Sequence, residues 1–343
     1  MKNGKGQRGT PLLCPSLNTH SQPEGGLYVR ESGIQPSTVS NDVTVQSPKR
    51  QPPFMRRARP YLILAPALLL TAGILYPFVI SIYYSLTNYS FKYADYAFVG
   101  LENWVYMFKN PDFYHSVVVT LKYALFSTGI QTVLGVIVAL LLNQETRLAK
   151  SLRIVLIFPL MVAPVIATLI WQLMTNQSVG ILNQWLRFFG VENFMWGADP
   201  KTALFTVVLI DVWVYTAFVI VLVLAGLRSL PQAPFESAKI DGGSAWFTFK
   251  TLTLPMIMPY ILIAVVFRLM ISLQEFSIIF ALTRGGPGDT LMTLSLRAYV
   301  EAFTYKELGF AIPYMLVLWV IVFIASNFLI KYWSYSQRKA SGN

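Results

Sequence analysis

Six long runs of mostly apolar residues follow one another along the chain after residue 60. They occupy about residues 61–86, 115–142, 153–174, 202–227, 254–283 and 310–332. A helix needs about 20 apolar residues to cross roughly 30 Å of hydrocarbon, and it satisfies its own backbone hydrogen bonds there. The pattern therefore predicts six transmembrane helices and an all-α membrane protein. The third run, which contains Pro159 and Pro164, is the least regular.

The composition agrees with a membrane protein. Of the 343 residues, 55% are hydrophobic and 13% are charged, and a soluble enzyme carries about a quarter charged residues. Cys14 is the only cysteine, which excludes an intrachain disulfide and a cysteine-based metal site. The two histidines, His20 and His115, are far apart in sequence and make a poor ligand set, so we expect no metal site.

The net charge of +11 becomes informative once the cations are located. Lys and Arg gather before the first run, in the second-to-third connection, in the fourth-to-fifth connection and in the C-terminal tail. Cytoplasmic connections of membrane proteins carry this excess, so both termini are predicted to be cytoplasmic. The cations then face an anionic lipid surface, and we expect a lipid membrane and no nucleic acid as the partner.

Residues 1–54 differ from the rest in composition. They are rich in Ser, Pro, Gly and Gln and have no apolar period, which is typical of a disordered tail, here cytoplasmic. No apolar core suited to a signal peptide lies near Met1. We expect this tail to be dispensable, because Met55 is followed by three arginines and then by the first run. Residues 55–343 are expected to form the transmembrane domain.

The fourth-to-fifth connection, residues 229–253, has the pattern of two short helices. Pro231 and Pro234 suit a helix start, because proline's missing N–H costs nothing there. Gly242 and Gly243 suit the end of that helix, since glycine adopts a left-handed cap without steric penalty. Ser244 can cap a second helix, which runs up to Leu254-Pro255. The pattern predicts a rigid helix–glycine–helix elbow on the cytoplasmic side, and a partner for it.

Several segments of the chain resemble those of one family. Glu236-Ser-Ala238, Asp241-Gly242 and Leu254-Pro255 with Pro259 are similar to the "EAA" loop of binding-protein-dependent ABC importer permeases. The resemblance continues in YLILAPALLLTAGILYP in the first run, in GLENWVYMFKNPDF at Gly100–Phe113, and in LTRGGPG at Leu282–Gly288. Together these segments look like the carbohydrate-uptake branch, specifically the membrane subunits of the maltose and glycerol-3-phosphate importers.

The resemblance implies a fold and a function. The fold is that of a type I ABC importer permease, with six transmembrane helices and cytoplasmic EAA coupling helices. The function is that of a permease subunit in a bacterial inner membrane, importing a sugar, polyol or related carbohydrate. The implied partners are a second homologous permease in a heterodimer, two ATP-binding cassette ATPase subunits and an extracytoplasmic solute-binding protein.

The resemblance also implies which residues couple the chain to the ATPases. They are Glu236, Ser237, Ala238, Asp241, Gly242 and Gly243, followed by Leu254 and Pro255 at the start of the fifth span. Ser237 and Gly243 stand where the family commonly has alanine. Both are small, so docking should survive, although Gly243 should loosen the elbow by roughly 0.5–1 kcal/mol relative to alanine.

The sequence offers no means of hydrolysing ATP. A GxxxxGK[ST] phosphate loop is absent, and the glycines at 285–288 lack the lysine that such a loop needs. No nucleophile–base set is visible either. We therefore expect a non-catalytic subunit with no cofactor of its own, and ATP and Mg on the partner ATPases.

Polar residues inside the runs are costly and therefore suggest function. Asp211, Trp213 and Tyr215 lie in the fourth run. The fifth run holds Arg268, Ser272, Gln274, Glu275 and Ser277. In one continuous helix, Arg268, Ser272 and Glu275 share a face. We predict a polar lining for a sugar or polyol, with Trp213 and Tyr215 offering ring faces; the alternative is internal pairing or contact with the partner permease.

The turn at Gly285, Gly286 and Pro287 is expected to shape an external loop beside the binding protein, and a plain turn is the alternative.

A self-contained secondary transporter or channel is the alternative class of protein. Such a transporter is expected to show matched halves or facing broken helices. The sequence shows no matched halves, and the elbow would have no purpose. A membrane enzyme would need catalytic clusters that are not seen.

Overall fold

The computed structural model describes residues 53–192 and 194–340. Their regular structure is helical, apart from one isolated antiparallel bridge between Thr87 and Phe98, which confirms the predicted all-α class. The chain divides into two compact units, Met1–Ile63 and Leu64–Asn343. The described part of the first unit is the beginning of helix α1 (Pro53–Ser85). The predicted disordered tail lies outside the described residues, except for Pro53 and Phe54 in α1.

Five helical segments are long and apolar enough to cross a membrane, and a bent pair brings the number to six if it counts as one span. The five segments are Leu64–Ser85, Pro111–Leu142, Pro200–Arg228, Ala245–Leu273 and Leu308–Tyr335. They correspond to α1, α3 (Pro111–Leu142), α7 (Pro200–Arg228), α9–η3–α10 (Ala245–Thr248, Phe249–Thr253 and Leu254–Leu273) and α13 (Leu308–Ala340). The six predicted runs are thus recovered, the third of them as the bent pair.

The remaining elements are short and connect or flank these spans. On the way from α1 to α7 they are α2 (Glu102–Lys109), α4 (Arg147–Ile157), η1 (Phe158–Met161), α5 (Pro164–Met174), α6 (Ile181–Phe188) and η2 (Trp196–Ala198). Beyond α7 they are α8 (Ala233–Ile240), α11 (Ser277–Thr283), α12 (Leu294–Tyr299) and η4 (Val300–Thr304).

The third predicted span is bent by 100° between Arg147–Met161 and Pro164–Met174. The two residues at the bend, Val162 and Ala163, have extended backbones with ψ of 132° and 134°. A residue that precedes proline is pushed out of the helical region by the proline ring, so Pro164 accounts for the extended Ala163. Pro164 then occupies the first turn of α5, where its missing N–H is harmless.

The fifth predicted span needs two corrections. At its start, Ala245–Leu273 forms one continuous helical segment with a π-helical stretch at η3, so Leu254-Pro255 lies within the helix and does not begin it. At its other end, α10 stops at Leu273 and α11 begins at Ser277, whereas the sequence predicted one run to 283. Glu275 lies in the break and is not on the helix that carries Arg268 and Ser272.

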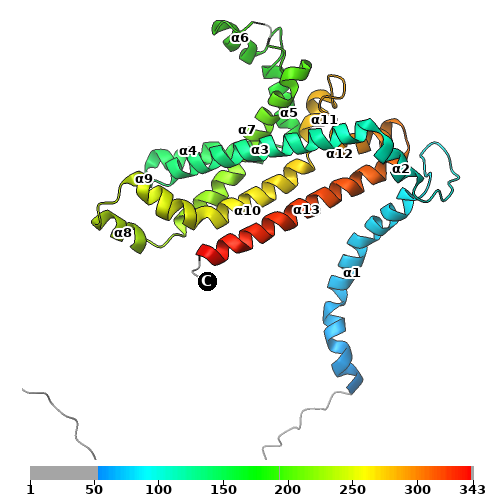
Figure 1. Ribbon diagram of the computed structural model, residues 1–343, viewed down its shortest axis with the longest axis horizontal. Helices are drawn as coiled ribbons and strands as arrows, with labels where there is room; N and C mark the ends of the chain where they lie inside the picture. The colour runs from blue at the N-terminus through cyan, green and yellow to red at the C-terminus, as the bar shows by residue number, and fades with distance from the viewer. Residues whose placement is uncertain (1–52, 193, 341–343) are drawn as a thin grey trace, which may run out of the picture. The chain divides into compact units, whose positions relative to one another are not determined.

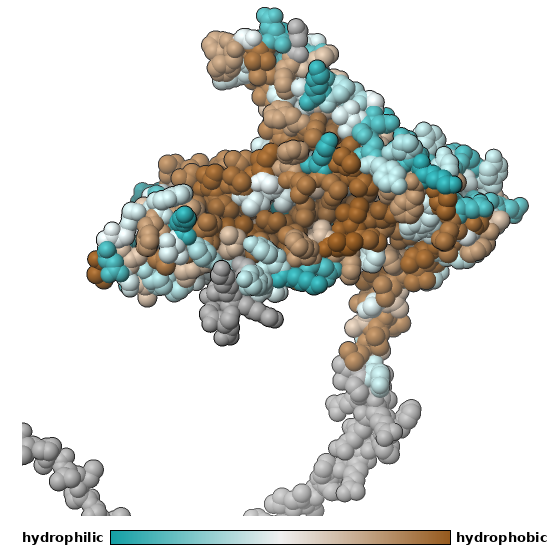
Figure 2. Space-filling view, in the orientation of Figure 1, coloured by the Kyte–Doolittle hydropathy of each residue, from teal (hydrophilic) through white to brown (hydrophobic). Residues whose placement is uncertain are grey.

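Helices α3, α7, α10 and α13 form the bundle at the centre of the second unit, with α8 and α9 at one end and α2 and α12 at the other (Figure 1). Between α3, α7 and α10 the core is made of small and branched residues, among them Ala139, Val219, Val223 and Ile257. The outer surface of the bundle is hydrophobic across its middle and more hydrophilic toward its two ends, as Figure 2 shows. This distribution is the one expected for a bundle surrounded by lipid.

The close approach of α3 and α7 depends on a glycine. A Cβ added at Gly135 would lie 2.6 Å from Cγ1 of Val219, whereas one added at Gly129, on the same helix, would meet nothing within 4 Å. Val219 cannot move aside easily, because its branched side chain has one strongly preferred rotamer in a helix. Gly135 therefore sets the distance between the two helices.

We expect Gly135→Ala to lower the free energy of unfolding by about 1–3 kcal/mol, the usual cost of overpacking a core. Gly129→Ala is the matched control: it should be neutral or slightly stabilising, because alanine favours a helix more than glycine does. Thermal unfolding of the two purified variants in the same detergent measures the difference. Equal unfolding temperatures would mean that the α3–α7 contact is not tight at this glycine.

Candidate functional site

The elbow predicted between the fourth and fifth spans is present in the structure. Pro234 lies in the first turn of α8. The helix ends at Ile240 and is followed by its C-cap Asp241 and by Gly242, which adopts a φ of +73°. The backbone N–H of Gly243 donates to the carbonyl oxygen of Ala238 at 2.8 Å, which closes the C-terminal turn of α8. The hydroxyl of Ser244 then accepts a hydrogen bond from the N–H of Phe247 at 3.2 Å and caps the next helix.

The surface of the elbow is not covered by any other part of the described chain. None of the residues of α8 is buried, so Glu236, Ser237 and Ala238 are all accessible to some degree. Ile240 is 86% exposed and Trp246 is 71% exposed, next to Phe247 at 55%. Large apolar side chains at such exposure on a polar loop are typical of a surface that binds another protein.

The base of the elbow is fastened to the end of α3. Arg228, the last residue of α7, forms an ion pair with Glu145 at 2.8 Å. Arg153 donates two hydrogen bonds to the carbonyl oxygen of Leu142, at 2.6 and 3.2 Å, and so caps the C-terminus of α3 with a cation. The cation-rich connections predicted to be cytoplasmic therefore meet at one end of the bundle.

Inside the bundle, four of the predicted pathway residues come together. Arg268 of α10 and Asp211 of α7 are both completely buried and form an ion pair at 3.1 Å. The same guanidinium donates to the hydroxyl of Ser272 at 3.0 Å and lies 4.2 Å from the ring centroid of Tyr215. These contacts correspond to the internal pairing that the sequence left open as the alternative to a substrate lining.

Gln131 of α3 completes this buried polar cluster, and the sequence analysis missed it. Its amide nitrogen donates to Oδ2 of Asp211 at 2.7 Å, and its amide oxygen accepts from Nε of Arg268 at 2.6 Å. The signal that could have found it is the single amide side chain inside the apolar run of the second span. The cluster, Gln131, Asp211, Tyr215, Arg268 and Ser272, thus joins three helices.

The other predicted pathway residues lie elsewhere. Trp213 points to α5, where its ring meets that of Trp171 at 6.0 Å between centroids. Glu275 lies in the break after α10, and its carboxylate accepts a hydrogen bond from the N–H of Ile278 at 2.9 Å. Ser277 begins α11, and Gln274 is exposed. The predicted residues therefore belong to three places: the buried cluster, the helix break and the contact of Trp213 with α5.

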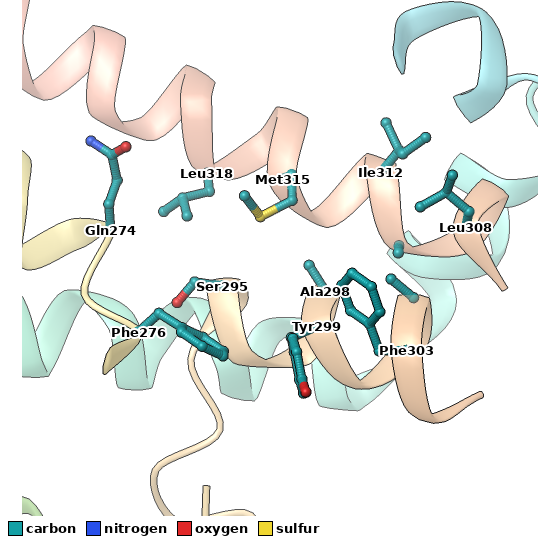
Figure 3. A pocket seen from close by; sticks show the side chains of 12 residues that line it. Gln274, Phe276, Ser295, Ala298, Tyr299, Phe303, Leu308, Ile312, Met315 and Leu318 are labelled. Atoms are coloured by element: carbon teal, nitrogen blue, oxygen red, sulfur yellow. The ribbon is translucent and has the colours of Figure 1, made fainter. Parts of the chain in front are cut away.

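A pocket of about 380 Å³ opens beside the helix break, between α12–η4 and α13 (Figure 3). Its lining is entirely uncharged. It combines the amide of Gln274 and the hydroxyl of Ser295 with aromatic and aliphatic side chains, namely Phe276, Ala298, Tyr299, Ala302, Phe303, Leu308, Ala311, Ile312, Met315 and Leu318. An apolar concave site with a few polar groups is the usual form of a small-molecule site.

The predicted turn at Gly285–Pro287 lies at the end of α3 opposite to the elbow. Gly285 and Gly288 have φ values of +95° and +58°, and the Gly286–Pro287 peptide is cis. The N–H of Leu291 donates to the carbonyl of Gly285 at 3.0 Å, and a ring nitrogen of His115 lies 2.8 Å from the carbonyl oxygen of Asp289. The turn is thus closed on itself and attached to the first helical turns of α3.

Close by, an ion-pair network attaches α12 to the same end of α3. Arg297 of α12 lies 2.5 Å from Asp112 and 3.5 Å from Glu301. Burial raises the pKa of the Glu301 carboxyl, and the neighbouring Arg297 guanidinium opposes that rise. Among residues 53–192 and 194–340, the acids, histidines and cysteines form no group of three or more that could hold a metal ion.

Comparison with known proteins places this geometry in context. Residues 131–333 match the profile of the family described as "Binding-protein-dependent transport system inner membrane component". The chain is 36% identical over 265 residues to the probable ABC transporter permease protein y4oQ of Sinorhizobium fredii, covering 76% of this chain and 85% of that protein. It is 38% identical over 212 residues to the trehalose/maltose transport system permease protein MalF of Thermococcus litoralis, covering 62% and 70%.

Two solved structures share the fold. One is a bacterial ABC transporter involved in the import of the acidic polysaccharide alginate, with a TM-score of 0.69 at 19% identity, over 82% of this chain and 97% of that one. The other is a bacterial alginate ABC transporter in complex with an alginate pentasaccharide-bound periplasmic protein, with a TM-score of 0.66 at 19% identity, over 80% and 94%. By sequence and by fold, the chain belongs to the family of membrane-spanning permease subunits of binding-protein-dependent ABC transporters.

Proposed function

We propose that this chain is a permease subunit of an ABC importer that carries a neutral carbohydrate inward, and that separate ATPase subunits drive it. The observation that carries the proposal is the exposed elbow, in which two helices and a left-handed glycine present Ile240, Trp246 and Phe247 to a partner. The similarity to the trehalose/maltose permease supports carbohydrate as the class of solute. The subunit itself is non-catalytic and holds no cofactor; ATP and Mg belong to the ATPases.

The elbow is the proposed docking site for the ATPase. Glu236, Ser237, Ala238 and Asp241 lie on or directly after α8, whose residues are all accessible, and Gly242 and Gly243 fix the angle to the next helix. Leu254 and Pro255 lie in the helix that continues from the elbow to Leu273, so they transmit its movement. An apolar surface bordered by charges is typical of a subunit interface. Such an interface would keep the elbow attached to the ATPase while the ATPase binds and releases nucleotide.

The proposed partners would cover surfaces that are exposed when this chain is considered alone. None of the apolar window in the span Leu64–Ser85 is buried against the rest of the described chain, and a second, homologous permease in a heterodimer would cover it. Two ATPases are proposed at the elbows of the two permeases. An extracytoplasmic solute-binding protein is proposed beside the turn at Gly285, Gly286 and Pro287. The cations near the elbow support a cytoplasmic location for that end and for both termini, in a bacterial inner membrane.

The pocket beside the helix break is the proposed sugar site. Gln274 and Ser295 supply uncharged hydrogen-bonding groups, and Phe276 and Tyr299 supply ring faces. The pocket lining itself carries no charge, and the nearest described cations are already paired, Arg268 with Asp211 and Arg297 with Asp112, so their charge is compensated without a phosphate or carboxylate on the solute. This is the reason for proposing a neutral sugar.

The buried polar cluster is proposed to hold the pathway helices together and not to line the pathway. Arg268 pairs with Asp211, hydrogen-bonds Gln131 and Ser272 and stacks on Tyr215, which leaves only its Nη1 without a hydrogen-bond partner, and the side chains of Asp211 and Arg268 have no exposed surface. Trp213, Glu275 and Ser277 remain candidates for a second contact with solute, since they flank the places where helices bend or break.

The direct test is uptake by the complete importer in proteoliposomes, with this chain, its partner permease, both ATPases and the solute-binding protein. The solutes are radiolabelled trehalose, maltose, maltotetraose and alginate pentasaccharide. We expect ATP-dependent accumulation of a neutral sugar. Accumulation without ATPase or ATP would indicate a secondary transporter or channel, uptake of the alginate oligosaccharide alone would refute neutral selectivity, and no uptake at all would refute the proposal.

Replacing Gly242 with valine should uncouple ATP hydrolysis from uptake. A Cβ at Gly242 would meet nothing within 4 Å, so the effect comes from forcing a branched residue to a φ of +73°, at about 1–2 kcal/mol. We expect normal membrane insertion and uptake reduced about tenfold, the factor that such an energy produces.

Gly190→Val is the control for that substitution. Gly190 has a φ of +80° and equally open surroundings, but it follows α6, which precedes α7 in the chain, whereas the elbow follows α7. Uptake by Gly190→Val should therefore stay close to that of the wild type. If both variants lost uptake equally, the defect would be general strain, and the role assigned to the elbow would be wrong.

Breaking the buried ion pair should cost stability more than selectivity. Arg268→Met leaves Asp211 charged and buried without its partner, which costs about 3–5 kcal/mol. The double variant Arg268→Met/Asp211→Leu removes both charges and should recover most of that loss. Thermal unfolding in detergent measures the cycle. A stable Arg268→Met protein with an altered choice of sugar would instead place Arg268 in contact with solute.

A further inference from the structure

A line of aromatic rings leads from the connection between α1 and α2 to the sugar pocket proposed above. Its members are Tyr96, Tyr84, Tyr89, Phe91, Phe303, Tyr299 and Phe276, and we refer to them as the aromatic track. Neighbouring ring centroids along it lie between 4.7 and 6.4 Å apart. The residues come from three distant parts of the sequence, so the fold and not a local motif brings them into one line.

Backbone hydrogen bonds fix the middle of the track. The N–H of Phe91 donates to the carbonyl of Lys306 at 2.8 Å, and the N–H of Gly309 donates to the carbonyl of Tyr89 at 2.8 Å. Lys92 adds an ion pair with Glu307 at 3.0 Å. The approach is close because position 309 is a glycine: a Cβ there would lie 2.2 Å from the carbonyl oxygen of Thr87. Phe91 is thus held at a fixed place next to Phe303.

The inner end of the track is part of the pocket. Phe276, Tyr299 and Phe303 lie in a row along α12–η4, on the side of the pocket across from α13 (Figure 3). Beyond the pocket three rings are open to the surroundings, with Phe303 61%, Phe91 51% and Tyr96 43% exposed, whereas Tyr84 and Tyr89 are half-buried. Large aromatic faces that stay exposed while being held in place by the backbone are available to a ligand.

The chemistry of these rings suits a sugar. A pyranose has faces made of C–H groups, which pack on the electron-rich face of an aromatic ring, and hydroxyl groups around its edge. Tyr84, Tyr89, Tyr96 and Tyr299 carry phenolic hydroxyls that can exchange hydrogen bonds with those edges. Aromatic stacking tolerates many orientations, so a sugar can pass from one ring to the next without a deep energy minimum. An acyl chain would need none of these hydroxyls.

We propose that the aromatic track is a carbohydrate-binding surface that guides the sugar from the end of the molecule opposite the elbow to the pocket at the helix break. The inference rests on the proposed function, because it takes carbohydrate as the solute. It assigns a role to Tyr89, Phe91 and Tyr96, which lie outside the residues that match the family, and to Phe303 within them.

The test replaces Phe91 and Phe303, one at a time, with leucine, which keeps apolar volume but removes the ring. Phe303→Tyr keeps the ring and should restore most of the affinity that Phe303→Leu loses. Tyr106→Leu is the matched control, because Tyr106 is 61% exposed and pairs with Phe310 on α13 but lies outside the track. The probe is whichever neutral sugar of the panel above the wild-type importer accumulates fastest.

We expect the half-saturating sugar concentration for uptake to rise about three- to tenfold in Phe91→Leu and Phe303→Leu, to rise much less in Phe303→Tyr, and to stay unchanged in Tyr106→Leu. The unfolding temperature should remain that of the wild type in all four. Unchanged uptake in the leucine variants would overturn the track alone. Loss of uptake together with a lowered unfolding temperature would show a purely structural cluster, and lack of uptake by the wild type would overturn the proposed function as well.

Discussion

The bundle depends on one buried charge, the guanidinium of Arg268. It lies in an apolar interior, where an unpaired ion would cost several kcal/mol. Asp211 and Gln131 compensate it from two other helices, at 3.1 and 2.6 Å. These distances leave little freedom, because a shift of α3, α7 or α10 along its axis would pull a carboxylate or an amide out of reach. The network of Arg268, Asp211 and Gln131 therefore contributes more to the register of the three helices than to their stability. Replacing a buried ion pair with apolar residues of similar volume is often neutral for stability.

Side-chain hydrogen bonds stabilise the interruption of the fifth predicted span after α10. Irregular backbone at membrane depth is tolerated only where it is buried in protein or lines a cavity. At the break after α10, the amide of Gln274 donates back to the carbonyl of Met270 at 3.0 Å, and Glu275 receives the N–H of Ile278 at 2.9 Å. The break also lines the pocket, so its irregular backbone is both packed within the protein and next to a cavity.

The spans and the elbow could be predicted from the sequence, because each depends on residues that are close together in the chain. Runs of apolar residues report membrane crossing directly, and Pro234, Gly242 and Ser244 each have one favoured position in a helix–glycine–helix elbow. The break at Gln274–Phe276 was missed because its polar residues, Gln274 and Glu275, were interpreted as the lining of one continuous helix; the capping by Glu275 marks the break. The pairing of Arg268 with Gln131 was out of reach, since the two are 137 residues apart. The track depends on tertiary contact in the same way.

Continuity along the fifth span joins the two proposed sites. The helical segment Ala245–Leu273 begins at the elbow and ends one residue before Gln274. At 1.5 Å per residue it is roughly 40 Å long, about the thickness of a membrane. The segment connects Trp246 with the break beside the pocket without a gap in the helix, although it contains the π-helical stretch η3 and Pro259, where helices bend. Arg268, less than two turns from the far end of the segment, ties it to α3 and α7. A movement of this segment must therefore take those helices along, and the pocket would change shape against α12 and α13, which lie outside the cluster.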